Sequence, residues 1–243
     1  MNGALVITGG SRGIGAACAR LGAQAGWPVC LGYRADRQSA DALVRDIEQA
    51  GGQALAVMGD VAHEDDVTQL FDRAAQAFGA IGGLVNNAGI LAPAARLVDM
   101  DLARWNATIA TNLTGAFLCA REAVRRMTAG GAIVNVSSMA AVLGAPDEFI
   151  DYAASKGGID ALTVGLAKEV AAQGIRVNGV RPGLIDTAIH ASSGDPQRAS
   201  RLAPNIPMRR TGTPEEVART ILWLLSDAAS YCTGIMVNVS GGR

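Results

Sequence analysis

The chain has few histidines and no cluster of cysteines, which argues against metal sites and against a Ser-His-Asp catalytic triad. Only His63 and His190 occur among 243 residues, so a histidine-rich metal site or a Ser-His-Asp triad has little material. The four cysteines share no metal-ligand spacing and lie among apolar or small neighbours. We interpret them as core residues and expect no metal. They are Cys18, Cys30, Cys119 and Cys232.

Long apolar runs and basic blocks are also absent. No apolar segment reaches the roughly 18 residues needed to span a bilayer, and the N-terminus lacks the pattern of a signal peptide. Lys and Arg number 21 against 22 Asp and Glu, for a net charge of −1, which gives no electrostatic case for nucleic acid. We therefore expect a cytoplasmic protein with neither a membrane nor a nucleic-acid partner.

Glycine is abundant, with 30 residues, and three of them form a phosphate-binding pattern. The apolar run at 4–7 leads directly into Gly9, Gly13 and Gly15, spaced G-x-x-x-G-x-G, and then into a helical pattern at 16–25. Glycines let the backbone approach a pyrophosphate, and the helix N-terminus offers free N–H groups. A tight turn without a ligand is the alternative, but the strand before and the helix after favour binding.

Strand and helix patterns alternate along the whole chain. We expect strands at 4–7, 29–33, 54–58, 83–85, 131–136, 175–180 and 235–239, and helices at 16–25, 41–50, 64–78, 102–127, 152–172 and 213–226. The last helix should start with Thr213 as N-cap and Pro214 at N1. This alternation predicts an α/β fold, a doubly wound parallel sheet of about seven strands with helices on both faces, in one domain over 1–243. Residues 187–207 lack periodic apolar residues and read as a mobile loop or lid.

Polar residues follow several predicted strands. Arg34 follows the strand at 29–33, and Arg12 in the glycine loop could reach the same place. Arginine there accommodates the 2′-phosphate of NADP, whereas an acid would bind the ribose of NAD, and we expect Asp36 to face solvent. Asp60 could accept a hydrogen bond from adenine or cap the next helix. Asn112 interrupts a helical stretch, where it is either solvated or functional.

Tyr152 and Lys156 lie one helical turn apart, with Ser138 after the strand at 131–136. A lysine charge typically lowers a tyrosine pKa of about 10 by about 1–3 units, which would make the phenol a proton donor and acceptor near neutral pH. Alone the pair is weak, because a half-buried tyrosine beside a solvated lysine is common.

Together these patterns resemble the short-chain dehydrogenase/reductase family of the roughly 250-residue type, over essentially all 243 residues. The resemblance rests on Thr8–Gly15, Asp60-Val61, Asn86-Asn87-Ala88-Gly89, Asn112, Ser137-Ser138, Tyr152-x-x-x-Lys156, and Pro182-Gly183 with Thr187. It implies a Rossmann-like fold, a nicotinamide cofactor and a homo-oligomer, a tetramer or a dimer. It also implies a division of the chain, with cofactor binding mainly in the N-terminal part and catalysis and the substrate loop in 138–210.

The resemblance assigns roles residue by residue. Tyr152 would transfer the proton, Ser138 would bind the substrate oxygen, Lys156 would hold the nicotinamide ribose, and Asn112 would hold a water in a proton relay. The implied cofactor-binding residues are Gly9, Ser11, Arg12, Gly13, Ile14, Gly15, Arg34, Asp60, Val61, Asn87, Ala88, Gly89, Tyr152, Lys156, Pro182, Gly183, Ile185 and Thr187.

Two positions depart from the family pattern. Ser138 lies fourteen residues before Tyr152 where thirteen is usual, which we interpret as an insertion in the loop 145–151. The alternative aligns Met139, which cannot donate a hydrogen bond. A glycine common after the serine is Ala141 here, which would alter the floor of the substrate pocket.

The predicted function is an NADP-dependent oxidoreductase that interconverts a ketone and a secondary alcohol. The alternatives are a non-catalytic dinucleotide-binding regulator, an NAD-dependent dehydrogenase of the same fold, and an epimerase or dehydratase with bound NAD. We expect a mostly apolar substrate wall without a fixed cationic clamp. Its residues are Ser138, Met139, Leu143, Tyr152, Leu184, Ile189 and His190.

Overall fold

Seven parallel strands form a single sheet at the centre of the molecule. The computed structural model describes residues 3–128, 130–187, 195 and 197–243. In these ranges the strand order is β3-β2-β1-β4-β5-β6-β7, and every neighbouring pair is parallel. The prediction of a doubly wound parallel sheet is confirmed. The strands are β1 (Ala4–Thr8), β2 (Val29–Tyr33), β3 (Ala54–Met58), β4 (Ile81–Asn86), β5 (Gly131–Val136), β6 (Ile175–Pro182) and β7 (Met236–Val239).

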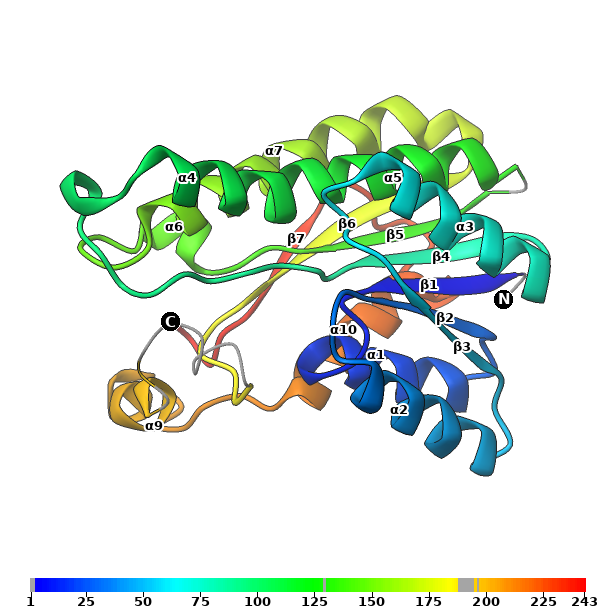
Figure 1. The fold of residues 1–243 in the computed structure, drawn as a ribbon, viewed down its shortest axis with the longest axis horizontal. Coiled ribbons are helices and arrows are strands. Elements are labelled where there is room, and N and C mark those ends of the chain that lie inside the picture. Colours follow the sequence, from blue (N-terminus) through cyan, green and yellow to red (C-terminus); the bar gives the residue numbers. More distant parts are fainter. Residues whose placement is uncertain (1–2, 129, 188–194, 196) are drawn as a thin grey trace.

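Helices cover both faces of the sheet, as an apolar parallel sheet requires (Figure 1). One apolar cluster lies between the sheet and α1, α2 and α10, and a second lies between the sheet and α3, α5 and α7. Every residue of β1 and of β2 is buried, which explains their unbroken apolar runs. The helices are α1 (Gly13–Gln24), α2 (Arg37–Gln49), α3 (Glu64–Phe78), α4 (Leu102–Ile109), α5 (Gly115–Arg126), α6 (Ala140–Leu143), α7 (Ile150–Val170), α9 (Arg198–Leu202) and α10 (Pro214–Leu225).

Capping side chains fix where two of these helices begin. Thr213 accepts a hydrogen bond from the Glu216 N–H, and the Glu216 side chain accepts one from the Thr213 N–H, so the predicted N-cap forms a complete capping box. Asp36 accepts from the Ser39 N–H at 3.0 Å and starts α2 at Arg37, earlier than predicted. The Asp36 side chain, expected to face solvent, also acts as a helix cap.

The predicted helical stretch at 102–127 is continuous, but it widens in the middle. A π-helical turn, η2 (Ala110–Thr114), joins α4 to α5 and contains Asn112. Asn112 is only 1% exposed, so the solvated interpretation is wrong. A π turn inside an α-helix is frequent at functional sites, and here it directs an asparagine into the protein.

Part of the predicted loop at 187–207 is ordered as helix. The helix α9 and the 3₁₀ turn η4 (Ala203–Asn205) occupy its second half, and Ile206 is 1% exposed. Polar residues interrupt the sequence of these short elements, so no apolar periodicity indicated a helix there. Residues 188–194 and 196, which include the substrate-wall candidates Ile189 and His190, lie outside the described residues. None of the helices in the described ranges has the length and apolarity that a bilayer crossing requires.

Candidate active site

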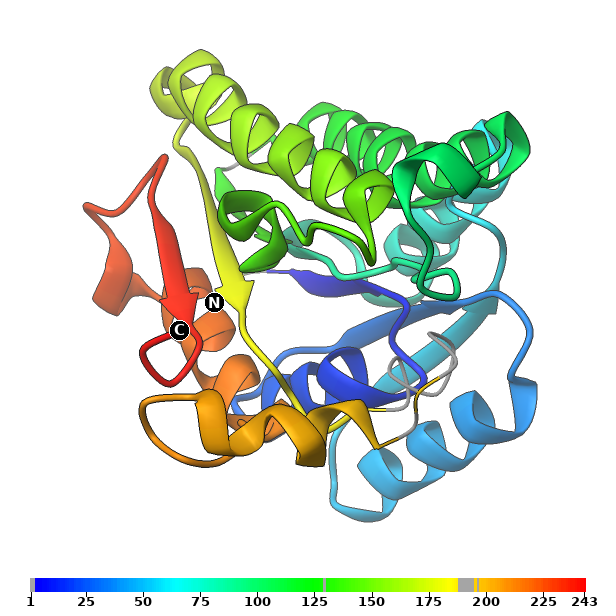
Figure 2. The same cartoon turned by 90° about the vertical axis from the view of Figure 1, so that its left-hand side faces the viewer.

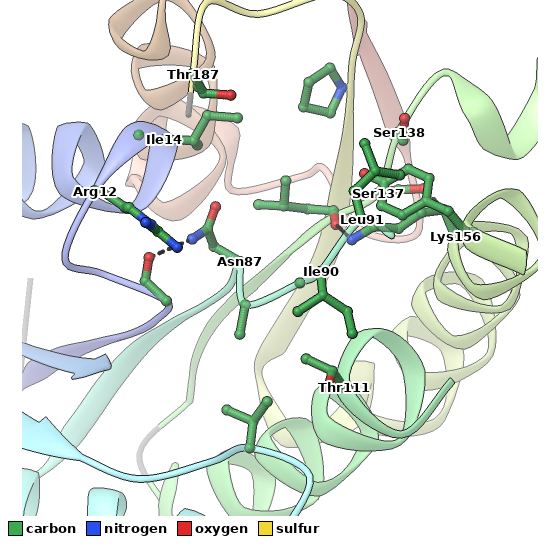
Figure 3. Close-up of a pocket in the computed structure, with 18 of the residues that line it drawn as sticks. Arg12, Ile14, Asn87, Ile90, Leu91, Thr111, Ser137, Ser138, Lys156 and Thr187 are labelled. Atoms are coloured by element: carbon green, nitrogen blue, oxygen red, sulfur yellow. Dashed lines mark hydrogen bonds between the residues drawn. The ribbon is translucent and has the colours of Figure 1, made fainter. Parts of the chain in front are cut away.

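The carboxyl ends of the strands lie along one edge of the sheet, which faces the viewer in Figure 2. A large cleft opens at this edge. Its volume is about 980 Å³, and loops after all of β1 to β6 contribute to its lining. Strand order reverses between β1 and β4, and in open α/β sheets ligands bind at such a switch point. Figure 3 shows Arg12, Ile14 and Thr187 on one side of the cleft and Ser138 and Lys156 on the other, with Asn87 between them.

The glycine loop after β1 has the shape of a phosphate cradle. Gly9 and Gly13 have φ of 61° and 55°, a region that disfavours side chains. A Cβ on Gly15 would lie 2.3 Å from the Gly9 carbonyl oxygen, so only glycine fits. Helix α1 follows with no capping side chain at Arg12 and no acid in its first turn, which leaves its N–H groups open to an anion. These features fit the pyrophosphate of a dinucleotide.

Asn87 joins the loops that follow β1 and β4. Its Nδ2 donates to the carbonyl oxygens of Thr8 and Gly9 at 3.0 and 2.9 Å. The Thr8 hydroxyl in turn accepts from the N–H groups of Asn87 and Ala88, each at 3.0 Å. The side chain therefore locks a turn, and this turn lines the cleft.

Charged side chains gather at the end of the cleft formed by β2 and β3. Arg34 Nη1 lies 3.7 Å from Asp60 Oδ2. The pKa of Asp36 is lowered, mainly by the hydrogen bonds that Asp36 accepts from Ser39 and to a smaller extent by the charge of Arg12. Asp60 Oδ1 accepts from the Ala62 N–H at 3.0 Å. The residue at the N-cap of α3 is His63, so the helix-capping alternative for Asp60 is wrong.

The opposite end of the cleft brings Ser138, Tyr152 and Lys156 together. The Ser138 hydroxyl lies near enough to the Tyr152 phenol to lower its pKa, and Ser138 Oγ accepts from the Ala140 N–H at 3.1 Å. Lys156 is 4% exposed, and its Nζ donates to the Val136 carbonyl oxygen at 2.7 Å. The same Nζ lies 5.6 Å from the centroid of the Tyr152 ring.

The fourteen-residue step between Ser138 and Tyr152 is accommodated in the turns before α7. Gly144, Ala145 and Asp147 have φ of 79°, 45° and 60°. These left-handed residues turn the chain back so that α7 starts with Tyr152 facing Ser138. Met139, the alternative partner, is 7% exposed, and its N–H donates to the Pro182 carbonyl oxygen at 3.0 Å.

Burial dominates the protonation of the tyrosine and the lysine. It raises the pKa of Tyr152 above its ordinary value, with Ser138 opposing. It lowers the pKa of Lys156 to about 8, with the Asp160 carboxylate opposing. The expectation that Lys156 lowers the tyrosine pKa is wrong for this arrangement, because Nζ lies over the ring and donates to a backbone carbonyl.

Asn112 holds the loop after β4. Its Nδ2 donates to the Ile90 carbonyl oxygen and to Ser155 Oγ, both at 3.1 Å, and its Oδ1 accepts from the Ile90 N–H at 2.8 Å. A Cβ on Gly89 would lie 3.4 Å from Asn112 Oδ1 and 3.6 Å from Lys156 Nζ, so both side chains border the same glycine. Its predicted part in a water relay stays a prediction.

The predicted cofactor residues after β6 also line the cleft, as Pro182, Gly183, Ile185 and Thr187. Thr187 faces the glycine loop, because a Cβ on Gly13 would lie 3.4 Å from Thr187 Cγ2. Of the predicted cofactor set, Gly15 is a packing residue of the loop, and the others line the cleft: Gly9, Ser11, Arg12, Gly13, Ile14, Arg34, Asp60, Val61, Asn87, Ala88, Gly89, Tyr152 and Lys156.

Sequence reasoning missed an arginine in the lining of the cleft. Arg198 lines the cleft, with its Nη2 2.5 Å from Glu148 Oε2 and its Cζ 5.3 Å from the centroid of the Phe149 ring. A cation is thus present in a wall expected to lack one, although Glu148 pairs with it. No periodic or motif signal identified it, because α9 stands in the stretch read as a loop.

Comparison with known proteins agrees with this geometry. The family model described as enoyl-(acyl carrier protein) reductase matches residues 9–243. The chain belongs to the short-chain dehydrogenase/reductase family. The predictions of this family and of an oxidoreductase enzyme are confirmed.

Its relatives in the family include several dehydrogenases. The chain is 51% identical to the uncharacterized oxidoreductase YgfF of Escherichia coli, over 98% of each chain. It is 45% identical to cis-4-hydroxycyclohexanecarboxylate dehydrogenase of Sinomonas cyclohexanicum, over 98% of this chain and 94% of that one. A crystal structure of a dehydrogenase/reductase from Sinorhizobium meliloti superposes with a TM-score of 0.93 at 34% identity, covering 100% of this chain and 95% of that one.

The cradle generates a first prediction. Gly15→Ala should weaken dinucleotide binding at least tenfold, because the new Cβ would displace the Gly9 carbonyl and open the loop. Titration of protein fluorescence with NADPH measures the effect. Gly165→Ala is the control, since a Cβ there meets nothing within 4 Å, and it should bind normally. Unchanged affinity in Gly15→Ala would contradict the cradle.

Lys156 generates a second prediction. Between pH 8 and about 10.5 the native lysine is neutral while the unfolded one is protonated, so the unfolded chain binds more protons and rising pH favours the native state. We therefore expect the unfolding free energy of the wild type, relative to Lys156→Met, to rise over this window. Denaturant unfolding of both proteins at pH 7 and pH 10 measures it. A difference independent of pH would refute the burial argument.

Proposed function

We propose that the protein is an NADP-dependent oxidoreductase that interconverts a ketone and a secondary alcohol, with Tyr152 as general acid and base. The observation that carries this proposal is the gathering of Ser138, Tyr152 and the buried Lys156 in one cleft with a glycine cradle. A non-catalytic regulator would need the cradle but has no need of two hydroxyls beside a buried lysine. The NAD-dependent dehydrogenase remains the second candidate.

The side chains suggest how the reaction proceeds. When bound, the nicotinamide cofactor supplies or accepts the hydride. Ser138 would hold the substrate oxygen by a hydrogen bond, and Tyr152, protonated at neutral pH as an ordinary phenol is, would donate its proton to that oxygen during reduction. Lys156 would bond the nicotinamide ribose and replace the lost proton by way of the phenol.

Two observations support NADP over NAD. The Arg34 side chain is 61% exposed and lies 3.7 Å from its partner Asp60, so its guanidinium can still reach a phosphate. Arg12 lies near Asp36 at the same end of the cleft and lowers its pKa, so a second guanidinium is available there for a phosphate.

Apolar side chains around Tyr152 support an apolar substrate. Met139 and Leu184 are buried in this wall, and Leu91, Leu143 and Phe149 also line the cleft. The relatives include a 3beta-hydroxysteroid dehydrogenase of Eggerthella lenta, 43% identical, and we propose a cyclic or otherwise bulky secondary alcohol. The homo-oligomer remains a prediction from the resemblance, and the cytoplasmic location and the small-molecule partner also remain predictions.

The tyrosine role is tested by Tyr152→Phe. We expect kcat to fall roughly 10²- to 10⁴-fold, the range for a lost general acid, with NADPH affinity within about twofold of the wild type. Absorbance at 340 nm follows NADPH oxidation with 4-oxocyclohexanecarboxylate, a 3-oxosteroid and a 3-oxoacyl thioester. The control is Tyr231→Phe, at a fully exposed tyrosine. Undiminished turnover in Tyr152→Phe would refute the mechanism.

The cofactor assignment is tested by Arg34→Gln. NADPH affinity should fall roughly tenfold or more while NADH affinity stays the same, because only the 2′-phosphate loses a charge-assisted bond. Arg37→Gln, at an exposed arginine outside the cleft lining, should change neither. Tighter binding of NADH than NADPH by the wild type would overturn the assignment.

A further inference from the structure

The helix that carries Tyr152 starts without a capping side chain. Phe149 is the N-cap of α7 and makes no side-chain bond, and the first bond within the helix runs from the Ala153 N–H to the Phe149 carbonyl at 2.9 Å. The N–H of Tyr152 therefore has no acceptor in the helix itself. The carboxylate of Asp151, the preceding residue, lies near it, and this N–H is among the groups that lower the pKa of Asp151.

Asp151 is a buried charge held by two residues of α4. It is 1% exposed. Arg104 grips it as a fork, with Nε 2.8 Å from Oδ2 and Nη2 3.3 Å from Oδ1. Thr108, one turn along α4 and also 1% exposed, donates its hydroxyl to Oδ2 at 3.2 Å. Burial raises the pKa of this carboxyl, but Arg104, the Tyr152 N–H and Thr108 outweigh it, so the pKa is lowered and the group is charged.

Arg104 also connects this charge to the loop that lines the cleft after β4. Its Nη1 donates to the Pro93 carbonyl oxygen at 2.6 Å. The same loop is bonded to the segment before α7, from the Ala95 N–H to the Glu148 carbonyl oxygen at 3.0 Å. The guanidinium therefore lies where α4, the cleft loop and the start of α7 meet.

We propose that Asp151, fixed by Arg104 and Thr108, is a positioning residue that sets the backbone of Tyr152 and hence the place of its hydroxyl against Ser138. Two strained residues, Ala145 and Asp147 at positive φ, precede α7, and such conformations persist only where the surroundings determine them. The carboxylate supplies a fixed point between that turn and the tyrosine. Positioning at this level matters because a displacement of about 1 Å can cost about 10²-fold in rate.

This inference rests on the proposed role of Tyr152, and two variants test it. Asp151→Asn keeps the size but removes the charge, and Arg104→Lys keeps the charge but removes the fork. In each we expect kcat, per folded enzyme and with NADPH and the fastest ketone of the panel above, to fall about tenfold while the KM for NADPH stays within twofold. Hydrogen exchange at the first turn of α7 should quicken.

The matched control is Arg126→Lys. Arg126 is also a partly buried arginine paired with two carboxylates, Glu122 and Asp72, but it stands at the far end of α5 and outside the cleft lining. It should lose stability without losing kcat per folded enzyme. An equal rate loss in this control would show a general effect of broken ion pairs and overturn the proposal.

Further outcomes separate the two levels of the argument. Wild-type kcat in both Asp151→Asn and Arg104→Lys overturns the positioning role, and if Tyr152→Phe is inactive at the same time the proposed function stands. Full activity in Tyr152→Phe removes the proposed function itself. If the wild type reduces no ketone of the panel, hydrogen exchange decides, since unchanged exchange at the Tyr152 N–H in Asp151→Asn refutes the positioning role of Asp151.

Discussion

Lys156 is bonded to the end of β5 from two of its groups, and the geometry of the site depends on this attachment. Its Nζ donates to the Val136 carbonyl oxygen at 2.7 Å, and its own carbonyl accepts from the Ser137 hydroxyl at 3.1 Å. The attachment fixes the rotation of α7 about its axis, and Tyr152, one turn earlier, then faces Ser138 just beyond β5. The energetic cost of this arrangement is the desolvation of the Lys156 ammonium, which lowers its pKa to about 8.

Buried amides extend the attachment deeper into the sheet. Asn86 Nδ2 donates to Asn135 Oδ1 at 2.9 Å, and Asn135 Nδ2 donates to Thr163 Oγ1 at 2.9 Å, which links β4 to β5 and β5 to α7. Buried polar groups are costly unless they are bonded, so a chain of bonded amides specifies one register between these elements. Asn112 and Asn87 do the same for the loops above, so the polar residues that border the cleft also hold its walls.

The fold and most of the cleft could be predicted from local patterns. Apolar strands, helix periodicity and the spacing Gly9, Gly13 and Gly15 are local, and parallel strands with alternating helices admit few topologies, so the carboxyl ends had to share an edge. Local patterns also predicted the Thr213 cap, and they predicted that Tyr152 faces Ser138 rather than Met139. They did not predict the pKa of Tyr152, because desolvation depends on what packs around a group.

The sequence by itself determined which residue types follow each strand along the chain, because each motif is contiguous. Only the tertiary structure decided that Asp36 caps α2, that Asn112 lies in a π turn bonded to Ile90, and that Arg198 enters the cleft. It alone joined Arg104 to Asp151 across 47 positions. The physical reason is that a side chain's partner is set by the packing of elements far apart in the chain, which local patterns do not encode.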